Sequence, residues 1–241
     1  MTSYPHLSKA PIAEAVLDIR VEVADEEIQQ QIESFHEKIK GEYPEKKKKN
    51  TIQAHVDLEE KSVTSRNDVT GFQFFSQDGK NVFQVDLDGV TVNRLKPYED
   101  WGTFLTRAKK LWEMYQQGFQ ITKIKRLALR YINHIPVKRG EDMDDYFTAP
   151  PRIPKDLPQV IAGYFSKTVF RNENKKIIGQ VTQTSFESSP DCFSAILDIE
   201  TIRTYEDNQG VNIWDDFEEL REFKNRIFFA SITDKTKGML T

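Results

Sequence analysis

Cysteine is almost absent from this sequence, since Cys192 is the single one among 241 residues. One cysteine cannot form an intrachain disulfide, and it excludes a zinc site built from several thiolates. The histidines have no spacing typical of a metal site; they are His6, His36, His55 and His134. We therefore expect no metal and no cofactor. We interpret Cys192 as a buried residue at the start of a strand, and such low cysteine usage is typical of a reducing compartment.

Long apolar runs are also missing. No stretch approaches about 18 consecutive apolar residues, so the sequence predicts no transmembrane helix. The first residues lack the basic and apolar regions of a signal peptide. We therefore expect a cytoplasmic protein without a membrane partner.

An excess of charge of one sign is the third absence. Lys and Arg total 34 against 38 for Asp and Glu, a formal net charge of −4. This balance argues against a protein built mainly to neutralise phosphates, although a local basic patch remains compatible with it. The obvious patch is Lys46–Lys49, which we interpret as a solvated turn between a helix and a strand. No glycine-rich loop opens a helix and no serine follows a strand–turn–helix elbow, so no reaction class is indicated.

What the sequence does contain is clear periodicity. From Glu14 to Val23, apolar and charged residues alternate, which predicts a half-buried strand. The same reasoning predicts further strands over 51–58, 69–95 (a hairpin with additional turns), 124–137, 176–186 and 192–204. Apolar stripes at helical spacing predict helices over 28–39, 101–118, 156–165 and 213–229.

These elements predict an α+β fold with a mainly antiparallel, curved sheet and helices packed on one face. Each half of the chain has the order strand, helix, several strands, helix, so we expect two structurally duplicated halves, 1–123 and 124–241. We expect them to pack as one compact unit. The polar, proline-containing connection 140–155 is the predicted hinge between them.

Charged residues occupy the strand positions opposite the apolar stripes. The candidate ligand-binding residues among them are Arg20, Arg126, Arg130, His134, Asp198 and Glu200. Arg126 and Arg130 lie four residues apart, roughly 13 Å along a strand, and such a ladder could bind phosphates. The two acids could hold a divalent cation or pair with the arginines, and we favour pairing. An ordinary solvated face is the simplest interpretation of the whole set.

Four short motifs occur in order along nearly the whole chain: Pro11-Ile12-x-Glu14-Ala15, Pro97-Tyr98-x-x-Trp101, Leu129-Arg130-Tyr131-Ile132-Asn133 and Phe228-Phe229-x-x-Ile232-Thr233. Together they resemble a sporadically distributed bacterial family of conserved hypothetical proteins of similar length. The resemblance implies a bacterial or archaeal protein and carries over no catalytic residue. A patchy distribution is typical of accessory genes, including phage-defence and toxin–antitoxin loci.

The motif residues each have a structural interpretation. We interpret Trp101 and Tyr131 as core aromatic residues with a polar tip. Asn133 reads as a side chain that satisfies backbone groups. Tyr98 belongs to the same motif as Trp101, and Glu14 is expected to pair with Arg130, tying the two halves together.

The functional prediction is a non-catalytic binding or interaction module, accessory or regulatory, with a protein partner or self-association as a homodimer. The first alternative is an enzyme or sensor that binds a phosphorylated ligand or nucleotide on the charged sheet face. A further alternative is nucleic-acid binding by the curved sheet, which the acidic balance disfavours. The sequence leaves open whether the protein is an enzyme.

Overall fold

The computed structural model describes residues 4–5, 7–24, 28–57, 62–159, 161, 163–189, 192–207 and 211–241. The first part of the chain forms β1 (Ile12–Val23), α1 (Ile28–Ile39), β2 (Glu45–Asp57), β3 (Ser62–Phe75), β4 (Asn81–Asp86), β5 (Gly89–Leu95) and α2 (Trp101–Gly118). The second part forms β6 (Ile121–Lys138), a short 3₁₀ helix (Met143–Asp145), β7 (Phe165–Asn172), β8 (Ile177–Ser189), β9 (Cys192–Thr204), α3 (Ile213–Ser231) and α4 (Asp234–Leu240).

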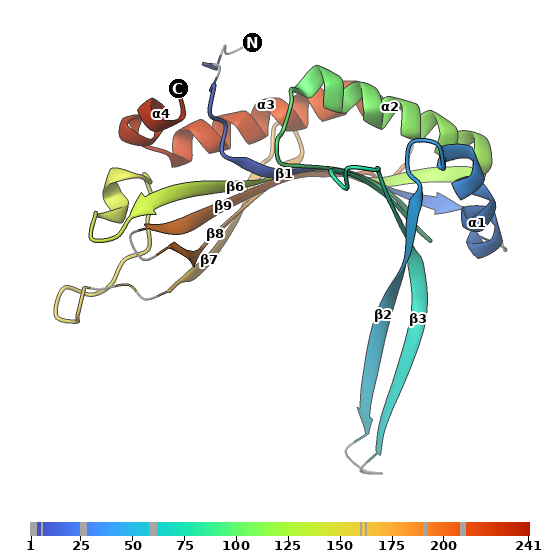
Figure 1. Ribbon diagram of the computed structural model, residues 1–241, viewed down its shortest axis with the longest axis horizontal. Coiled ribbons are helices and arrows are strands. Elements are labelled where there is room, and N and C mark those ends of the chain that lie inside the picture. Colours follow the sequence, from blue (N-terminus) through green and yellow to red (C-terminus); the bar gives the residue numbers. More distant parts are fainter. Residues whose placement is uncertain are drawn as a thin grey trace.

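Within these residues, nine strands form one antiparallel sheet in the order β2-β3-β4-β5-β1-β6-β9-β8-β7. The sheet is curved and open, and α1, α2 and α3 lie on its convex side (Figure 1). The predicted α+β class, the curved antiparallel sheet and the single helical face are therefore confirmed. The opposite, concave face carries no helix among the described elements.

The two halves follow the same path through the sheet. In the first half, β1 lies at the centre of the sheet. Strands β2 to β5 then follow in order from one edge toward the centre, so that β5 pairs with β1, and α2 comes after β5. In the second, β6 is laid down beside β1, β7 to β9 run from the other edge inward until β9 pairs with β6, and α3 follows. This shared path agrees with the expected duplication. The first half has α1 where the second has the connection 139–164.

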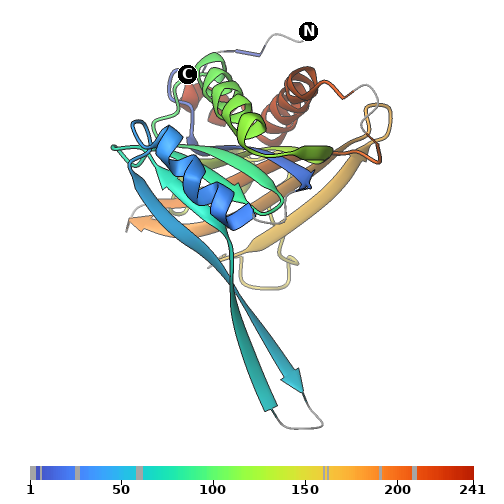
Figure 2. The same cartoon turned by 90° about the vertical axis from the view of Figure 1, so that its right-hand side faces the viewer.

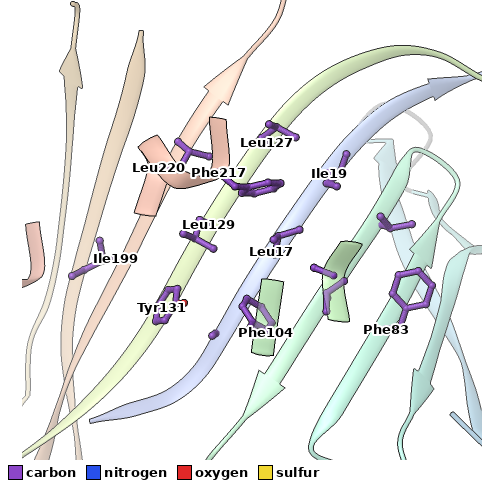
Figure 3. Close-up of a cluster of buried hydrophobic side chains, with 14 of the residues drawn as sticks. Leu17, Ile19, Phe83, Phe104, Leu127, Leu129, Tyr131, Ile199, Phe217 and Leu220 are labelled. Carbon is purple, nitrogen blue, oxygen red and sulfur yellow. The ribbon is translucent and has the colours of Figure 1, made fainter. Parts of the chain in front are cut away.

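Alternation along the two central strands creates the core between the sheet and the helices. Leu17 and Ile19 on β1 are fully buried, as are Leu127 and Leu129 on β6. Phe104 from α2 packs over the same region, and α3 supplies Phe217 and Leu220 (Figure 3). Burying each large aliphatic side chain contributes roughly 2 kcal/mol, so this layer fixes which face of the sheet receives the helices.

Helix α2 begins and lies where its sequence predicts. The Asp100 side chain caps it by accepting a hydrogen bond from the Thr103 backbone N–H at 2.9 Å. Its buried stripe follows helical spacing and comprises Phe104, Ala108, Leu111, Trp112 and Tyr115. It lies beside α3 (Figure 2), where the Lys109 ammonium lies 5.4 Å from the centre of the Trp214 ring.

Strands β2 and β3 extend beyond the sheet as a long hairpin arm, which projects toward the concave side (Figures 1 and 2). The expected turn at Lys46–Lys49 is wrong, because these lysines belong to the base of β2 and pair with β3. Lysines can occupy strand positions here because their side chains contact aromatic rings of β3. The Lys46 ammonium lies 5.2 Å from the centre of the Phe72 ring, and the Lys47 ammonium lies 4.7 Å from the centre of the Phe75 ring.

The second half differs from prediction in two places. The helix expected over 156–165 is wrong: its described residues form a turn near Leu157 and then the start of β7. Pro158 removes a backbone donor there, and β7 lies at an edge, exposed on both faces, so it has no apolar stripe for the sequence to reveal. Helix α4 was not predicted either.

Part of the predicted hinge segment is tied to the C-terminal helices. Phe147 forms an isolated bridge with Ile232, and the Thr148 backbone N–H donates to the Ser231 carbonyl at 3.0 Å. Tyr146 and Phe147 are both 1% exposed. The hinge itself and the division at residue 123 stay predictions.

Candidate functional site

Five of the six predicted ligand-binding residues converge on the concave face. With four further residues they form a concave charge network, which comprises Asp18, Arg20, Lys49, Asp86, Asp88, Arg126, Arg130, Asp198 and Glu200. The reason is strand geometry: on β1, β6 and β9 the charged residues alternate with buried apolar ones, so they leave the sheet on the side away from the helices. Lys49 and Asp88 reach the same side from β2 and from the turn after β4.

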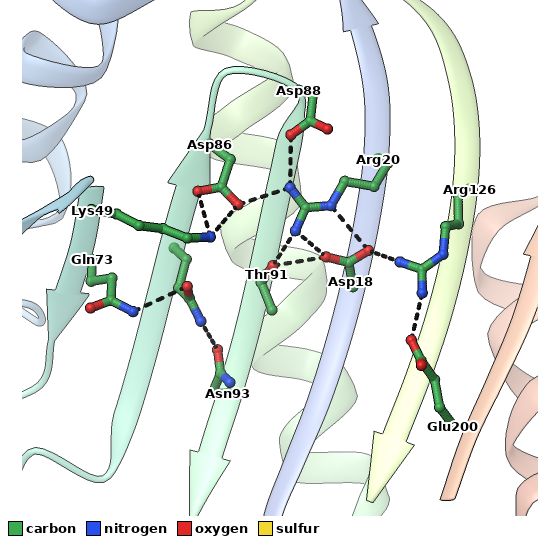
Figure 4. Close-up of polar contacts among 11 residues, drawn as sticks. Asp18, Arg20, Lys49, Gln73, Asp86, Asp88, Thr91, Asn93, Arg126 and Glu200 are labelled. Atoms are coloured by element: carbon green, nitrogen blue, oxygen red, sulfur yellow. Dashed lines mark hydrogen bonds and ion pairs between the residues drawn. The ribbon is translucent and has the colours of Figure 1, made fainter. Parts of the chain in front are cut away.

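One continuous chain of ion pairs crosses the sheet (Figure 4). It begins at Lys49, whose ammonium lies 2.9 Å from Asp86. The Arg20 guanidinium bridges Asp86 at 2.8 Å and Asp18 at 2.7 Å. The chain then continues to Arg126, and these residues come from β2, β4, β1 and β6 in turn.

The two halves are joined electrostatically at Asp18 and Arg126, which are 2.8 Å apart across β1 and β6. Arg126 in turn reaches Glu200 on β9 at 2.5 Å. The expected Glu14–Arg130 pair is wrong. Arg130 pairs instead with Asp198 within its own half, and Glu14 accepts a 2.6 Å hydrogen bond from the Asn93 side chain.

The interpretation of Asp198 and Glu200 as arginine partners is confirmed. Arg130 binds Asp198 through two parallel hydrogen bonds, from Nε at 2.8 Å and from Nη2 at 2.6 Å. This bidentate contact raises the pKa of Arg130. Burial disfavours the charge of Arg20, but Asp18 and Asp86 more than offset it and raise the pKa of its guanidinium.

A second chain of hydrogen bonds, made by amide side chains, lies beside the network and reaches β3 (Figure 4). Gln73 donates to Gln84 at 3.2 Å, Gln84 donates to Asn93 at 2.9 Å, and Asn93 ends the chain on Glu14. Above these groups lies an open hollow of about 250 Å³. The residues that line the hollow are mainly polar, and Val16 is one of the few apolar ones.

His134 lies apart from the hollow. It lies four residues after Arg130 on the same face of β6, in the last third of the strand, and is partly buried. Burial, followed by the charge of Lys96, lowers its pKa, so the imidazole is neutral near pH 7. Of the predicted residues, the structure therefore brings Arg20, Arg126, Arg130 and Glu200 together around the hollow. Asp198 lies outside the lining but pairs with Arg130, and His134 lies outside it as well.

The motif residues have mainly structural surroundings on the convex side. Tyr131 is 3% exposed, and its hydroxyl lies 2.8 Å from that of Tyr98. Trp101 donates from its indole N–H to Glu218 on α3, as expected for an aromatic with a polar tip. Asn133 donates to the Leu197 carbonyl at 2.9 Å, which confirms its predicted role toward the backbone.

A buried lysine was not singled out from the sequence. Lys224 on α3 is 8% exposed, and its ammonium lies 3.8 Å from the centre of the Tyr131 ring. Burial, assisted by Arg221, lowers its pKa to about 7. Its place in the apolar stripe of α3, between Phe223 and Ile227, was the available signal.

The sequence also missed Lys49, Thr91 and Asn93 as members of the site. Lys49 was assigned to a turn, although its position at the base of β2 brings it to Asp86. Thr91 and Asn93 alternate with Val90 and Val92 on β5, a pattern that reveals their face but not their partners.

The described residues contain no group of three or more His, Cys, Asp or Glu arranged to hold a metal ion. His6 and the side chains of His55 and Cys192 lie outside the described part. Within that part, none of the helices combines the length and apolar character needed to cross a membrane. No protein-family model matches the chain, and no curated protein matches it in sequence.

Proposed function

We propose that this protein is a binding module that holds a partner protein against the concave face of its sheet. The observation that carries the proposal is the concave charge network. Its arginines and carboxylates hold one another in fixed orientations before any partner arrives, which reduces the entropy lost on binding. The bidentate Arg130–Asp198 pair extends this ordered surface toward β8.

The charges favour a protein surface over a phosphate. Arg20, Arg126 and Arg130 are each paired with a carboxylate at 2.8 Å or less. A phosphate at this face would have to displace those carboxylates and would lie next to them afterwards. A protein surface carrying both signs of charge can add hydrogen bonds to the existing pairs, and complementary charge gives it specificity.

The dimensions of the face also suit a protein. In sheet order, the seven neighbouring strands β4-β5-β1-β6-β9-β8-β7 span roughly 29 Å. Seven residues of a strand span roughly 23 Å, so the face has an area of about 650 Å². A stable protein–protein interface buries about 800 Å² on each partner. The hairpin arm of β2 and β3, which projects on the same side, supplies further contact area (Figure 1).

Site-specific photo-crosslinking tests the proposal. A benzoylphenylalanine replaces Thr182, whose register with Asp198 puts it on the concave face, or Gln116, which is exposed on α2. Crosslinking in cells of the source organism is expected to give one discrete protein adduct from position 182 and none from position 116.

The digestion pattern of the adduct separates the alternatives. A protease-sensitive, nuclease-resistant adduct supports the proposal, whereas a nuclease-sensitive adduct overturns it in favour of nucleic acid. A thermal-shift screen with nucleotides and inorganic phosphate covers the other alternative. A rise in melting temperature of several degrees that a folded Arg130→Ala variant loses would assign the face to a phosphorylated ligand.

A further inference from the structure

Strand β7 leaves one edge of the sheet open. It pairs with β8 on one side, and seven of its eight residues are exposed. Three of these are large and apolar: Phe165 is 72% exposed, Val169 55% and Phe170 37%. An edge strand carries unpaired backbone N–H and C=O groups, which are a template for another strand. Exposed apolar side chains on such an edge mark a surface that a partner covers.

The cations around this edge differ from those of the concave charge network. Lys167 and Arg171 on β7, and Arg226 on α3, form no ion pair with any residue in the described part of the chain. Arg171 and Arg226 line an open hollow of about 430 Å³ at the end of β7, together with Phe170 and Phe223. The Phe170 and Phe223 rings meet edge to face, with centres 6.0 Å apart. One carboxylate, from Glu173, also lines the hollow.

We propose that the free edge of β7 binds an extended, acidic segment of a partner protein, which adds to the sheet as a further strand. The backbone of β7 supplies hydrogen bonds, as in other cases of strand addition. Lys167 and Arg171 supply charge for acidic residues of the segment, and Phe165 and Val169 supply apolar contacts on the same face as these cations. A carboxylate at the end of the segment reaches the hollow beside Arg226.

A second copy of this chain suits the edge poorly. Pairing β7 with the β7 of another copy would bring two lysines and two arginines onto one short ladder, where like charges destabilise the pairing. Basic residues on an edge strand therefore discourage self-association and leave the edge open to an acidic strand. Lys167 and Arg171 are not members of the concave charge network, although the register of Lys167 with Thr182 and of Thr182 with Asp198 puts them on the same side of the sheet. The test below changes no residue of that network, so its failure is distinguishable from a failure of the proposed function.

An unbiased peptide selection tests the inference. A phage-displayed library of random twelve-residue peptides is selected on the intact protein, with counter-selection on the Lys167→Glu/Arg171→Glu variant. We expect enrichment of peptides in which acidic and apolar residues alternate. Selected peptides are expected to bind the reversed variant roughly tenfold more weakly or worse, and to lose affinity between 50 and 250 mM salt.

Two controls give the result its meaning. Lys38→Glu/Lys40→Glu makes the same change of net charge at the C-terminal end of α1, near the opposite edge, and is expected to leave peptide binding unchanged. Strand addition uses alternate backbone amides of the peptide, so N-methylation of one alternating set should abolish binding while the other set is tolerated.

The outcomes that overturn the inference are distinct. They are the absence of any enriched peptide, enrichment without acidic residues, or equal tolerance of both N-methylated sets. A dimer in sedimentation velocity that dissociates in the Phe165→Ser/Val169→Ser variant would assign the edge to a second copy and would also overturn it.

Discussion

On β1, Leu17 and Ile19 point toward the helices, while Asp18 and Arg20, one residue along in each case, point to the concave face (Figures 3 and 4). The first pair is stabilised by removal from water, a force that salt and pH scarcely change. The second pair is stabilised by ion pairs that depend on both. The same strand therefore carries two independent sources of stability, and substitutions on its two faces should respond differently to solution conditions.

The largest expected effect is on the convex side. Leu17→Ala removes a fully buried side chain at the centre of the core, so the free energy of unfolding should fall by about 3 kcal/mol. Urea denaturation at 0.1 and 1 M sodium chloride measures it, and we expect the same loss at both. The partly exposed Leu105→Ala is the matched control and should lose less. A strongly salt-dependent loss for Leu17→Ala would erase the contrast between the faces.

The corresponding change on the concave side is Arg20→Met. It leaves the side chains of Asp18 and Asp86, 10% and 6% exposed, without the cation that bridges them. We expect a loss of about 2–3 kcal/mol at pH 7. A loss below about 0.5 kcal/mol would show that the network does not stabilise the fold.

Lys224 is an exception on the convex side, because its contribution to the free energy of unfolding depends on pH. Its folded-state pKa of about 7 lies below the ordinary value of 10.5, so the unfolded chain binds more protons between these values. Stability should therefore rise with pH, by up to about 2 kcal/mol between pH 7 and pH 9. The contact of the ammonium with the Tyr131 ring favours the charged form and reduces the rise. Lys224→Met should flatten the profile, and an unchanged slope in that variant would contradict the assignment.

The smallest effect is expected at the rim of the network. The Arg130 side chain is 45% exposed, so solvent screens its pair with Asp198. Arg130→Gln should cost about 0.5 kcal/mol in the free energy of unfolding. A double-mutant cycle with Asp198→Asn measures the coupling directly. A coupling as large as that expected at Arg20 would place the pair among the buried ones.

The sequence predicted the residues that alternate or repeat with a regular period. Strand β1 and helix α2 were predicted nearly to their ends because their apolar residues all meet one continuous core. Strand β7 was missed because it is an exposed edge strand, whose fit depends on β8 and not on burial. The lysines at the base of β2 were misread because the Phe72 and Phe75 rings that receive them lie elsewhere in the sequence.

The candidate site divides in the same way. Alternation assigned Arg20, Arg126, Asp198 and Glu200 to one face, and opposite charges predicted that arginines and acids would pair. Neither alternation nor charge could show which arginine pairs with which acid. Glu14 lies opposite Ile132 rather than Arg130, and this register places the connecting pair at Asp18 and Arg126.

By itself, the sequence determined the α+β class, the apolar and charged faces of the central strands, and the position of the main helices. These follow from hydrophobic periodicity, which is a local property of the chain. Only the tertiary structure decided the strand order, the ion-pair partners and the open edge at β7. Each of these depends on which distant segments become neighbours, and that is settled by the packing of the whole sheet against its helices.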